Sequence, residues 1–377
     1  MFRWKSLNSS RYFQIFTKLA DMGHNVHVVQ PPPLQSTDTG FIESDMRLPG
    51  NIFIHDTNIN KFFWNFNLPL NKIIKKGFYS LIANRDIKRM VKDLNIDAVI
   101  LYNLSHYPLS RIRDCIKIYD IGDDLIPMLK RELGVFNNSL AINLAKKLLQ
   151  NMQRNCDIIT AISQVLCENN SPEAYVIPNG VNLEDAVIGS GKEIKSKYGR
   201  PIIGFVGSFE YYIDFDIILS TAENLKDFTF LLVGGGREFA RVKEKVKKMG
   251  LANVYLTGGK THRELMRYID AMDICINPFL KSPLSHAASP IKLFEYLSFK
   301  KPVISTRLRG VQAIDQGFLY YADDAGEMTM AIKGILANQD EAMVKAEKGF
   351  NVVKDKYTWG RIAGQILELV KKIKADE

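Results

Sequence analysis

The feature that most constrains this chain is a regular alternation of short apolar, β-branched runs with longer segments of helical periodicity. Several of these runs are apolar at every position, which is typical of strands that helices cover on both faces. The predicted strands are 26–29, 98–101, 116–119, 158–160 and 175–177 in the first half, and 202–206, 229–233, 254–256, 274–276 and 303–305 in the second. The pattern therefore predicts an α/β fold with parallel sheets.

Length indicates two domains. The chain has 377 residues, whereas one hydrophobic core rarely serves more than roughly 250 to 300. We predict a first domain at 1–185, a linker rich in glycine and charge at 186–200, and a second domain at 200–352, followed by a C-terminal segment at 353–377. The first predicted helix ends at Gly23 and precedes the first predicted strand, so the sequence leaves open whether a first strand is missing.

Composition limits the cellular compartment and the kind of binding partner that we expect. Hydrophobic residues make up 46% of the chain, and no apolar stretch reaches the roughly 18 to 20 residues that cross a bilayer. The four cysteines lie far apart without a Cys-x-x-Cys pair, so we expect a reducing cytoplasm, no disulfides and no structural zinc. The net charge of +9 favours an anionic partner, which could be a nucleotide, a nucleic acid or a membrane face.

The strongest local signal is the start of a predicted helix. Ser289 is a good N-cap, Pro290 suits the first helical position, and Ile291 begins an apolar stripe. The unpaired N–H groups at such a helix start attract an anion, and Lys292 adds a charge that suits a phosphate. Glu295 can accept two hydroxyl groups of a ribose. The alternative is an ordinary capped helix with a solvated lysine and glutamate.

This segment resembles the donor-binding signature of GT-B glycosyltransferases. The segments Tyr-Val-Ile-Pro-Asn-Gly-Val-Asn at 175–182, Phe-Val-Gly-Ser at 205–208 and Leu-Val-Gly-Gly-Gly at 232–236 are similar to family segments in the same order. Residues 258–265 are similar to the loop that receives the base. The resemblance implies two Rossmann-like domains facing a cleft, a C-terminal helix that crosses back to the first domain, and a nucleotide-sugar co-substrate without a metal or other cofactor.

The resemblance also implies donor-binding residues, partly supported by glycines that follow two predicted strands and allow close backbone approach. The predicted set is Gly207, Ser208, Gly235, Arg237, Lys260, Ser289, Pro290, Ile291, Lys292 and Glu295. This sequence departs from the family's pattern at two places, which limits the residue roles that the resemblance implies. Ala287 stands where many retaining members have a first glutamate, with His286 or Ser289 as substitutes, and no basic residue follows Gly207 directly. Retaining and inverting chemistry both stay open, as does a binding protein without turnover.

Three carboxylates follow the predicted strand at 116–119. Asp120, Asp123 and Asp124 lie at the carboxyl end of that strand, where one of them could act as general base for an acceptor hydroxyl. The stretch resembles the Tyr-Asp-x-x-Asp-Asp segment of bacterial polysaccharide glycosyltransferases. The alternative is a helix cap for Asp123 or Asp124. Arg11 is a candidate for binding on the acceptor side, and the alternative is a solvated surface arginine. His106 is a catalytic candidate, and the alternative is a histidine packed in a loop.

Basic and aromatic residues gather between Lys61 and Lys92, which suits the interface of an anionic membrane. We favour membrane contact for 61–79 and, from Arg85 onward, an ordinary helix with solvated charges and with Ala83, Ile87, Met90 and Leu94 on the core. No recognised motif supports nucleic acid. We expect a glycosyltransferase of cell-envelope or exopolysaccharide assembly that uses a glycan or lipid-linked acceptor at the cytoplasmic membrane face. The alternatives are a nucleotide-sugar-binding partner protein and a GT-B-fold epimerase.

Overall fold

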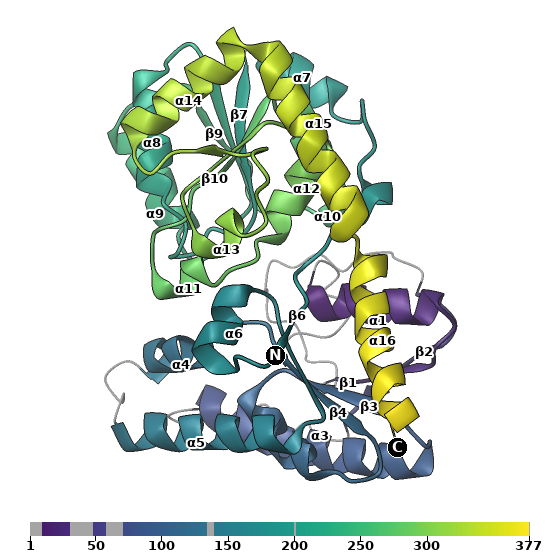
Figure 1. Cartoon of the computed structure of the whole chain (residues 1–377). Coiled ribbons are helices and arrows are strands. Elements are labelled where there is room, and N and C mark those ends of the chain that lie inside the picture. Colours follow the sequence, from purple (N-terminus) through teal and green to yellow (C-terminus); the bar gives the residue numbers. More distant parts are fainter. Residues whose placement is uncertain (1–9, 31–47, 58–70, 134–138, 200, 377) are drawn as a thin grey trace. The chain divides into compact units, whose positions relative to one another are not determined.

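The computed structural model describes residues 10–30, 48–57, 71–133, 139–199 and 201–376. These residues form two compact units. In Figure 1 the colours follow the sequence, from purple at the N-terminus to yellow at the C-terminus. Unit 1 holds the described residues up to Pro178 together with 362–376. Unit 2 holds Asn179–Arg361. Within the described residues, the chain passes between the units after Pro178 and again after Arg361.

Unit 2 contains a six-stranded parallel sheet in the order β12-β11-β10-β7-β8-β9. Its strands are β7 (Ile202–Val206), β8 (Thr229–Val233), β9 (Val254–Leu256), β10 (Ile274–Asn277), β11 (Val303–Ser305) and β12 (Tyr320–Tyr321). After β9 at one edge, the chain returns to the middle and adds β10 beside β7. This reversal is a topological switch point, and open α/β sheets bind ligands at the carboxyl ends of the strands there.

Helices cover both faces of this sheet, with α8, α9 and α14 on one side and α7, α10, α12 and α15 on the other (Figure 1). Their bounds are α7 (Lys192–Tyr198), α8 (Phe215–Asn224), α9 (Phe239–Lys248), α10 (His262–Ala271), α11 (Pro283–His286), α12 (Ile291–Ser298), α13 (Arg309–Gln312), α14 (Ala325–Ala337) and α15 (Gln339–Lys356). Every residue of β7, β8, β10 and β11 is buried. This explains why these strands are apolar throughout rather than alternating.

Unit 1 is also built on parallel strands. The strands are β1 (Val26–Gln30), β2 (Ile52–Asp56), β3 (Ala98–Leu101), β4 (Ile116–Ile121), β5 (Ile158–Ala161) and β6 (Tyr175–Val176). Within the described ranges they form a four-stranded sheet, β3-β4-β5-β6, and a separate pair, β1-β2. The helical elements are α1 (Arg11–Asp21), α3 (Asn71–Asp93), η2 (Leu104–Arg111), α4 (Leu125–Leu133), α5 (Ser139–Asn155), α6 (Gln164–Asn170) and α16 (Trp359–Asp376).

The first helix shows how local sequence sets these boundaries. The Ser10 side chain accepts a hydrogen bond from the Phe13 amide and so caps α1. Gly23, with a φ of +90°, adopts the left-handed conformation that ends the helix before β1. The question of a missing first strand concerns residues 1–9, which lie outside the described residues.

Three expectations need correction. The predicted linker at 186–200 contains α7, which packs against α10, and Gly191 donates its amide to Asp270. Two strands, β2 and β12, were not predicted. Leu94, which we expected on the core side of this helix, is 47% exposed.

Candidate functional site

Two glycine turns follow β7 and β8 at the carboxyl edge of the unit 2 sheet. Gly207, Gly234 and Gly236 have φ angles of +139°, +140° and +149°, a region that favours glycine. Gly207 donates its amide to the Val233 carbonyl over 3.0 Å, and a Cβ on Gly234 would overlap the Gly207 carbonyl oxygen. The two turns therefore pack directly on each other, and a side chain at Gly234 would separate them.

The start of α12 lies beside these turns and differs from the prediction in one detail. The helix begins at Ile291 with Pro290 as its N-cap, and no side chain caps it. Ser289 instead accepts a hydrogen bond from the Asn179 amide at 3.3 Å, while the Asn179 side chain donates to the Ser289 carbonyl at 2.7 Å. Ser289 is therefore a tether for the segment before α12 and not its cap.

Lys292 in the first turn of α12 reaches over the switch point. Its Nζ lies 4.2 Å from the ring centroid of Phe205 on β7 and 5.3 Å from that of Phe279, which follows β10. A Cβ placed on Gly207 would lie 2.8 Å from the same Nζ, so glycine leaves the room that the lysine occupies. Burial lowers the pKa of Lys292 to about 7, although the charge of Glu295 opposes this shift.

Glu295 lies one turn further along α12 and has a histidine beside it. It is 9% exposed, and burial raises the pKa of its carboxyl group against the opposing charges of His262 and Lys292. His262 Nδ1 lies 3.9 Å from Glu295 Oε1, and His262 Nε2 lies 3.2 Å from Asp185 Oδ2. Burial alone would lower the pKa of His262, but the hydrogen bond with Asp185 and the charges of both acids raise it overall.

His262 and Asp185 were not predicted as site residues. They stand 77 residues apart in the sequence, so spacing gives no sign that they meet. The available signal was weaker: His262 is the first residue of α10 and falls within 258–265, the segment similar to the base-receiving loop.

The remaining predicted donor residues lie in loops at the same edge of the sheet. Ser208 is exposed and Lys260 is half-buried. The Gly235 carbonyl accepts the Phe209 amide at 2.8 Å. Arg237 has a side chain that is 74% exposed and lies 3.6 Å from Glu210. The structure thus gathers the predicted loops at one edge but directs Arg237 toward a carboxylate.

His286, a predicted substitute for the missing glutamate, ends the short helix α11. Its Nδ1 accepts the Arg309 amide at 3.2 Å. A Cβ on Gly310 would lie 2.5 Å from the Ala288 carbonyl oxygen and 3.0 Å from the His286 carbonyl oxygen, so α13 packs closely on this loop. The hydrogen bond to the Arg309 amide orients the ring within unit 2, and its role as a substitute for the missing glutamate stays a prediction.

Asp120, in unit 1, is 1% exposed at the end of β4. Arg11 donates to it through Nε at 2.8 Å and Nη2 at 2.9 Å, and Thr160 donates at 2.6 Å. Arg11 also donates to the Pro178 carbonyl at 2.7 Å. The alternative that Arg11 is a solvated surface residue is wrong, because it is 6% exposed. This saturated ion pair favours a structural role for both residues, because Asp120 has no exposed oxygen for a substrate.

The other acceptor-side candidates differ in availability. Asp123 is solvent accessible, yet the surrounding protein and the charges of Asp120 and Asp124 raise its pKa to about 6. Asp124 accepts a hydrogen bond from the Ile126 amide and so caps α4, which is the alternative that we gave for this residue. Burial lowers the pKa of His106 to about 4, and His106 Nδ1 accepts the Tyr102 amide at 3.3 Å. Of the three carboxylates, Asp120 is held by an ion pair and Asp124 caps a helix, so Asp123 is the one most available to a substrate.

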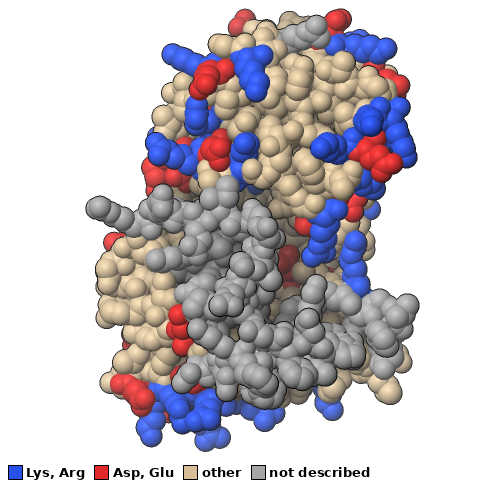
Figure 2. Space-filling view, turned by 180° about the vertical axis from the view of Figure 1, so that it is seen from behind, with Lys and Arg blue, Asp and Glu red and all other residues tan. Residues whose placement is uncertain are grey.

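The predicted membrane surface falls largely outside the described part of the chain, which includes no residue of 58–70. Further along α3, Arg85, Lys88, Arg89 and Lys92 are exposed. Figure 2 shows basic side chains gathered at the lower end of the view, where Figure 1 places α3 and α5. None of the helices in the described ranges combines the length and apolar character of a bilayer crossing.

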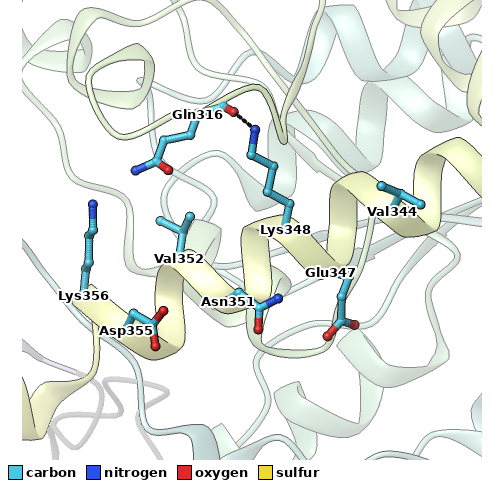
Figure 3. Close-up of a pocket in the computed structure, with 8 residues that line it drawn as sticks. All are labelled: Gln316, Val344, Glu347, Lys348, Asn351, Val352, Asp355 and Lys356. Carbon is cyan, nitrogen blue, oxygen red and sulfur yellow. Dashed lines mark hydrogen bonds between the residues drawn. The ribbon is translucent and has the colours of Figure 1, made fainter.

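A cavity of about 500 Å³ opens elsewhere in unit 2, along α15. Figure 3 shows Lys348 reaching to the Gln316 carbonyl, with Asp355 and Lys356 further along the helix. The lining residues are Gln316, Val344, Glu347, Lys348, Asn351, Val352, Asp355 and Lys356. None of these residues belongs to the group at the switch point, and we assign no site to this cavity.

Comparisons with known proteins agree with this geometry. Residues 200–338 match the family model "Glycosyl transferases group 1". A curated relative, the putative teichuronic acid biosynthesis glycosyltransferase TuaH of Bacillus subtilis (strain 168), is 28% identical over 205 residues, which are 52% of this chain and 50% of the relative. The match thus spans about half the length of that relative.

Solved structures match over a larger part of the chain. Sucrose-phosphate synthase from Thermosynechococcus elongatus has a TM-score of 0.76 at 18% identity, covering 97% of this chain and 93% of that one. Anabaena Alr3699/HepE in complex with UDP-glucose has a TM-score of 0.63 at 14% identity, covering 85% and 86%. At these identities the likeness shows the fold alone. The chain therefore has the GT-B fold, and its residues 200–338 are similar to the glycosyl transferases group 1 domain.

Proposed function

We propose that this protein transfers a sugar from a nucleotide-sugar donor to an acceptor. One observation carries the proposal: at the switch point of the group 1 domain, Lys292 and the uncapped start of α12 lie beside the Gly207 turn, with Glu295 one turn further on. Positive charge and free amides suit a diphosphate, and a buried carboxylate suits the hydroxyls of a ribose.

The same groups can assist the chemistry. When the bond between the sugar and the diphosphate breaks, negative charge builds up on the departing phosphate oxygen. A protonated Lys292 and the dipole of α12 stabilise that charge more strongly in a site shielded from water than they would in solvent. Asp123, with its pKa of about 6, is the proposed base for the acceptor hydroxyl in an inverting reaction. A retaining reaction would not need that base.

The names of two similar proteins guide the choice of donor and acceptor. HepE binds UDP-glucose, and TuaH is described as a teichuronic acid biosynthesis enzyme. We therefore propose a uridine nucleotide-sugar as the first donor to test. We propose a glycan or lipid-linked acceptor of cell-envelope or exopolysaccharide assembly, used at the cytoplasmic face of the membrane. Metal independence stays a prediction.

Thermal-shift measurements with UDP, GDP, ADP and UDP-glucose test the donor site. We expect one of these ligands to raise the melting temperature of the wild-type protein and to lose most of that effect with Glu295→Ala. Glu244→Ala is the matched control, because Glu244 is an exposed glutamate on α9 paired with Lys248 at 2.9 Å. If no ligand stabilises the folded wild-type protein, or if both variants respond alike, the donor site is wrongly assigned.

Transfer is then measured with the donor so identified. Product analysis after incubation with that donor and a glycan or lipid-linked acceptor should show a new glycosidic bond. Binding without transfer or donor hydrolysis would indicate a non-catalytic binding protein, and conversion of the donor alone would indicate an epimerase.

A further inference from the structure

The group formed by Asp185, His262 and Glu295 holds an unsatisfied polar atom. His262 Nδ1 is buried and has no hydrogen-bond partner among the described residues. Its other nitrogen, Nε2, pairs with Asp185 at 3.2 Å, and Asn182 donates to the same Asp185 oxygen at 3.3 Å. The ring is therefore fixed in orientation, and its free nitrogen lies 3.9 Å from Glu295 Oε1.

That separation is too long for a direct hydrogen bond and leaves the pair incomplete. Buried polar atoms are nearly always paired, and an unpaired one destabilises the protein. If Asp185 holds the proton on Nε2, then Nδ1 of a neutral ring presents a lone pair toward a carboxylate oxygen. If the ring is protonated, Nδ1 presents a proton that no acceptor reaches. In both states a group is needed between His262 and Glu295.

A hydroxyl group meets this need in either protonation state. It can donate to a neutral Nδ1, or accept from a protonated Nδ1 while donating to Glu295. A vicinal diol supplies two such groups at once, one for each of the two side chains. An ammonium group, which only donates, or a carbonyl, which only accepts, could satisfy only one of these states.

Helix formation does not explain His262. Thr261 and Glu264 form a complete capping box at the start of α10: the Thr261 hydroxyl accepts the Glu264 amide, and the Glu264 carboxylate accepts the Thr261 amide at 2.8 Å. The helix start is thus satisfied without the imidazole. The contact with Asp185 orients the ring, but it leaves Nδ1 unused.

We propose that His262 is a donor-binding residue, whose Nδ1 hydrogen-bonds one hydroxyl of the ribose while Glu295 hydrogen-bonds the other. The inference rests on the proposed function and adds a second residue to its ribose site. Asp185 is then a positioning residue that acts through the imidazole. The site selects ribonucleotides over deoxyribonucleotides, because a missing hydroxyl leaves Nδ1 or Oε1 unpaired again.

The test compares ribonucleotides with deoxyribonucleotides. The probe is the tightest binder among UDP, GDP and ADP, together with its 2′-deoxy and 3′-deoxy forms, measured by isothermal titration calorimetry. On the wild-type protein we expect each deoxy form to bind about 10-fold more weakly or worse. In His262→Phe, which keeps the ring volume, the ribonucleotide should weaken by a similar factor and one of the two deoxy penalties should disappear.

Two further variants keep the test decisive. His262→Asn retains a short group that can donate and accept, so it should keep part of the lost penalty even if the Phe variant folds poorly. Glu295→Gln should reduce the other penalty. Unchanged penalties in the folded His262 variants, with ribonucleotide binding still sensitive to Glu295, would overturn the role of His262 alone. If UDP, GDP and ADP all fail to bind the wild-type protein, the proposed function and this inference fail together.

Discussion

At the scale of single residues, the proton on Lys292 links nucleotide binding to pH. Burial among Phe205, Phe279 and the Gly207 turn lowers its pKa to about 7, so above that pH the free protein holds it mainly neutral. A bound diphosphate favours the charged form and therefore raises the pKa of the lysine in the complex. Nucleotide binding must then take up a proton between these two pKa values.

We predict that nucleotide affinity falls as pH rises from about 7 toward the ordinary lysine range, by up to about tenfold per pH unit. Calorimetry in buffers of different ionisation enthalpy should show proton uptake in this window. The second ionisation of a phosphate lies near pH 6, below this window. His262, whose pKa is raised above its usual value, is present in both the wild-type protein and Lys292→Arg, so the contribution of the lysine is the part of the pH dependence that this variant loses. Lys292→Arg stays charged and should bind without this pH dependence. A wild-type affinity that is flat from pH 7 to 9.5 would contradict the prediction.

The sequence predicted part of the residue-scale picture. Lys292 and Glu295 could be found because they lie within one helix whose spacing is readable. The pairs His262–Asp185 and Arg11–Asp120 could not, because they join residues 77 and 109 positions apart. The partners of Asp120, Arg11 and Thr160, are likewise far from it in the sequence. The sequence therefore predicted a catalytic role for Asp120 without showing the hydrogen bonds that favour a structural role.

At the scale of elements, prediction depended on apolar and β-branched runs. The strands β3, β7, β8, β9 and β11 have the predicted bounds, because each carries such a run, whether the strand is fully buried, as in β7, β8 and β11, or partly exposed, as in β3 and β9. The strand β2 was missed because it is partly exposed and carries His55 and Asp56, and β12 because it has two residues. The glycine and charge at 186–200 indicated a linker, but Gly191 lies where a Cβ would be 2.4 Å from the Arg267 carbonyl, so it marks close packing.

The tether between Asn179 and Ser289 makes an element-scale prediction. Both residues are 8% exposed, and the Asn179 side chain donates to the Ser289 carbonyl directly before α12. In Asn179→Ala that buried carbonyl loses its donor, which should lower the unfolding free energy by about 1 to 3 kcal/mol. Because the start of α12 then shifts, we also expect nucleotide affinity to fall about tenfold, as measured by calorimetry.

Asn224→Ala serves as the matched control for this tether. Asn224 is an exposed asparagine at the end of α8, and its loss should change neither quantity. Ser289→Ala, which removes the acceptor of the Asn179 amide, should weaken nucleotide binding in the same direction. Destabilisation of Asn179→Ala without any change in affinity would show that the tether serves the fold alone.

At the scale of the whole molecule, the described residues form two units, and the chain crosses between them after Pro178 and again after Arg361. At the first crossing, two consecutive residues are held by different units. The Pro178 carbonyl accepts a hydrogen bond from Arg11 in unit 1, and the Asn179 side chain donates to the Ser289 carbonyl in unit 2. After the second crossing, residues 362–376 belong to unit 1, where Lys374 pairs with Asp97. The last helix, α16, therefore begins in unit 2 with residues 359–361 and continues as part of unit 1 from Ile362.

This division predicts two calorimetric unfolding transitions that respond to different changes. A nucleotide at 100 times its Kd stabilises the unit that binds it by about 2.7 kcal/mol, so it should raise the unit 2 transition by roughly 5 °C or more. Truncation after Arg361 removes Ile362, Ala363 and Ile366, which are 0%, 0% and 4% exposed, and should lower the other transition. The nucleotide shift should survive this truncation, because Lys292, Glu295 and His262 all remain. A single transition that moves as a whole with both changes would show instead that the two units unfold as one.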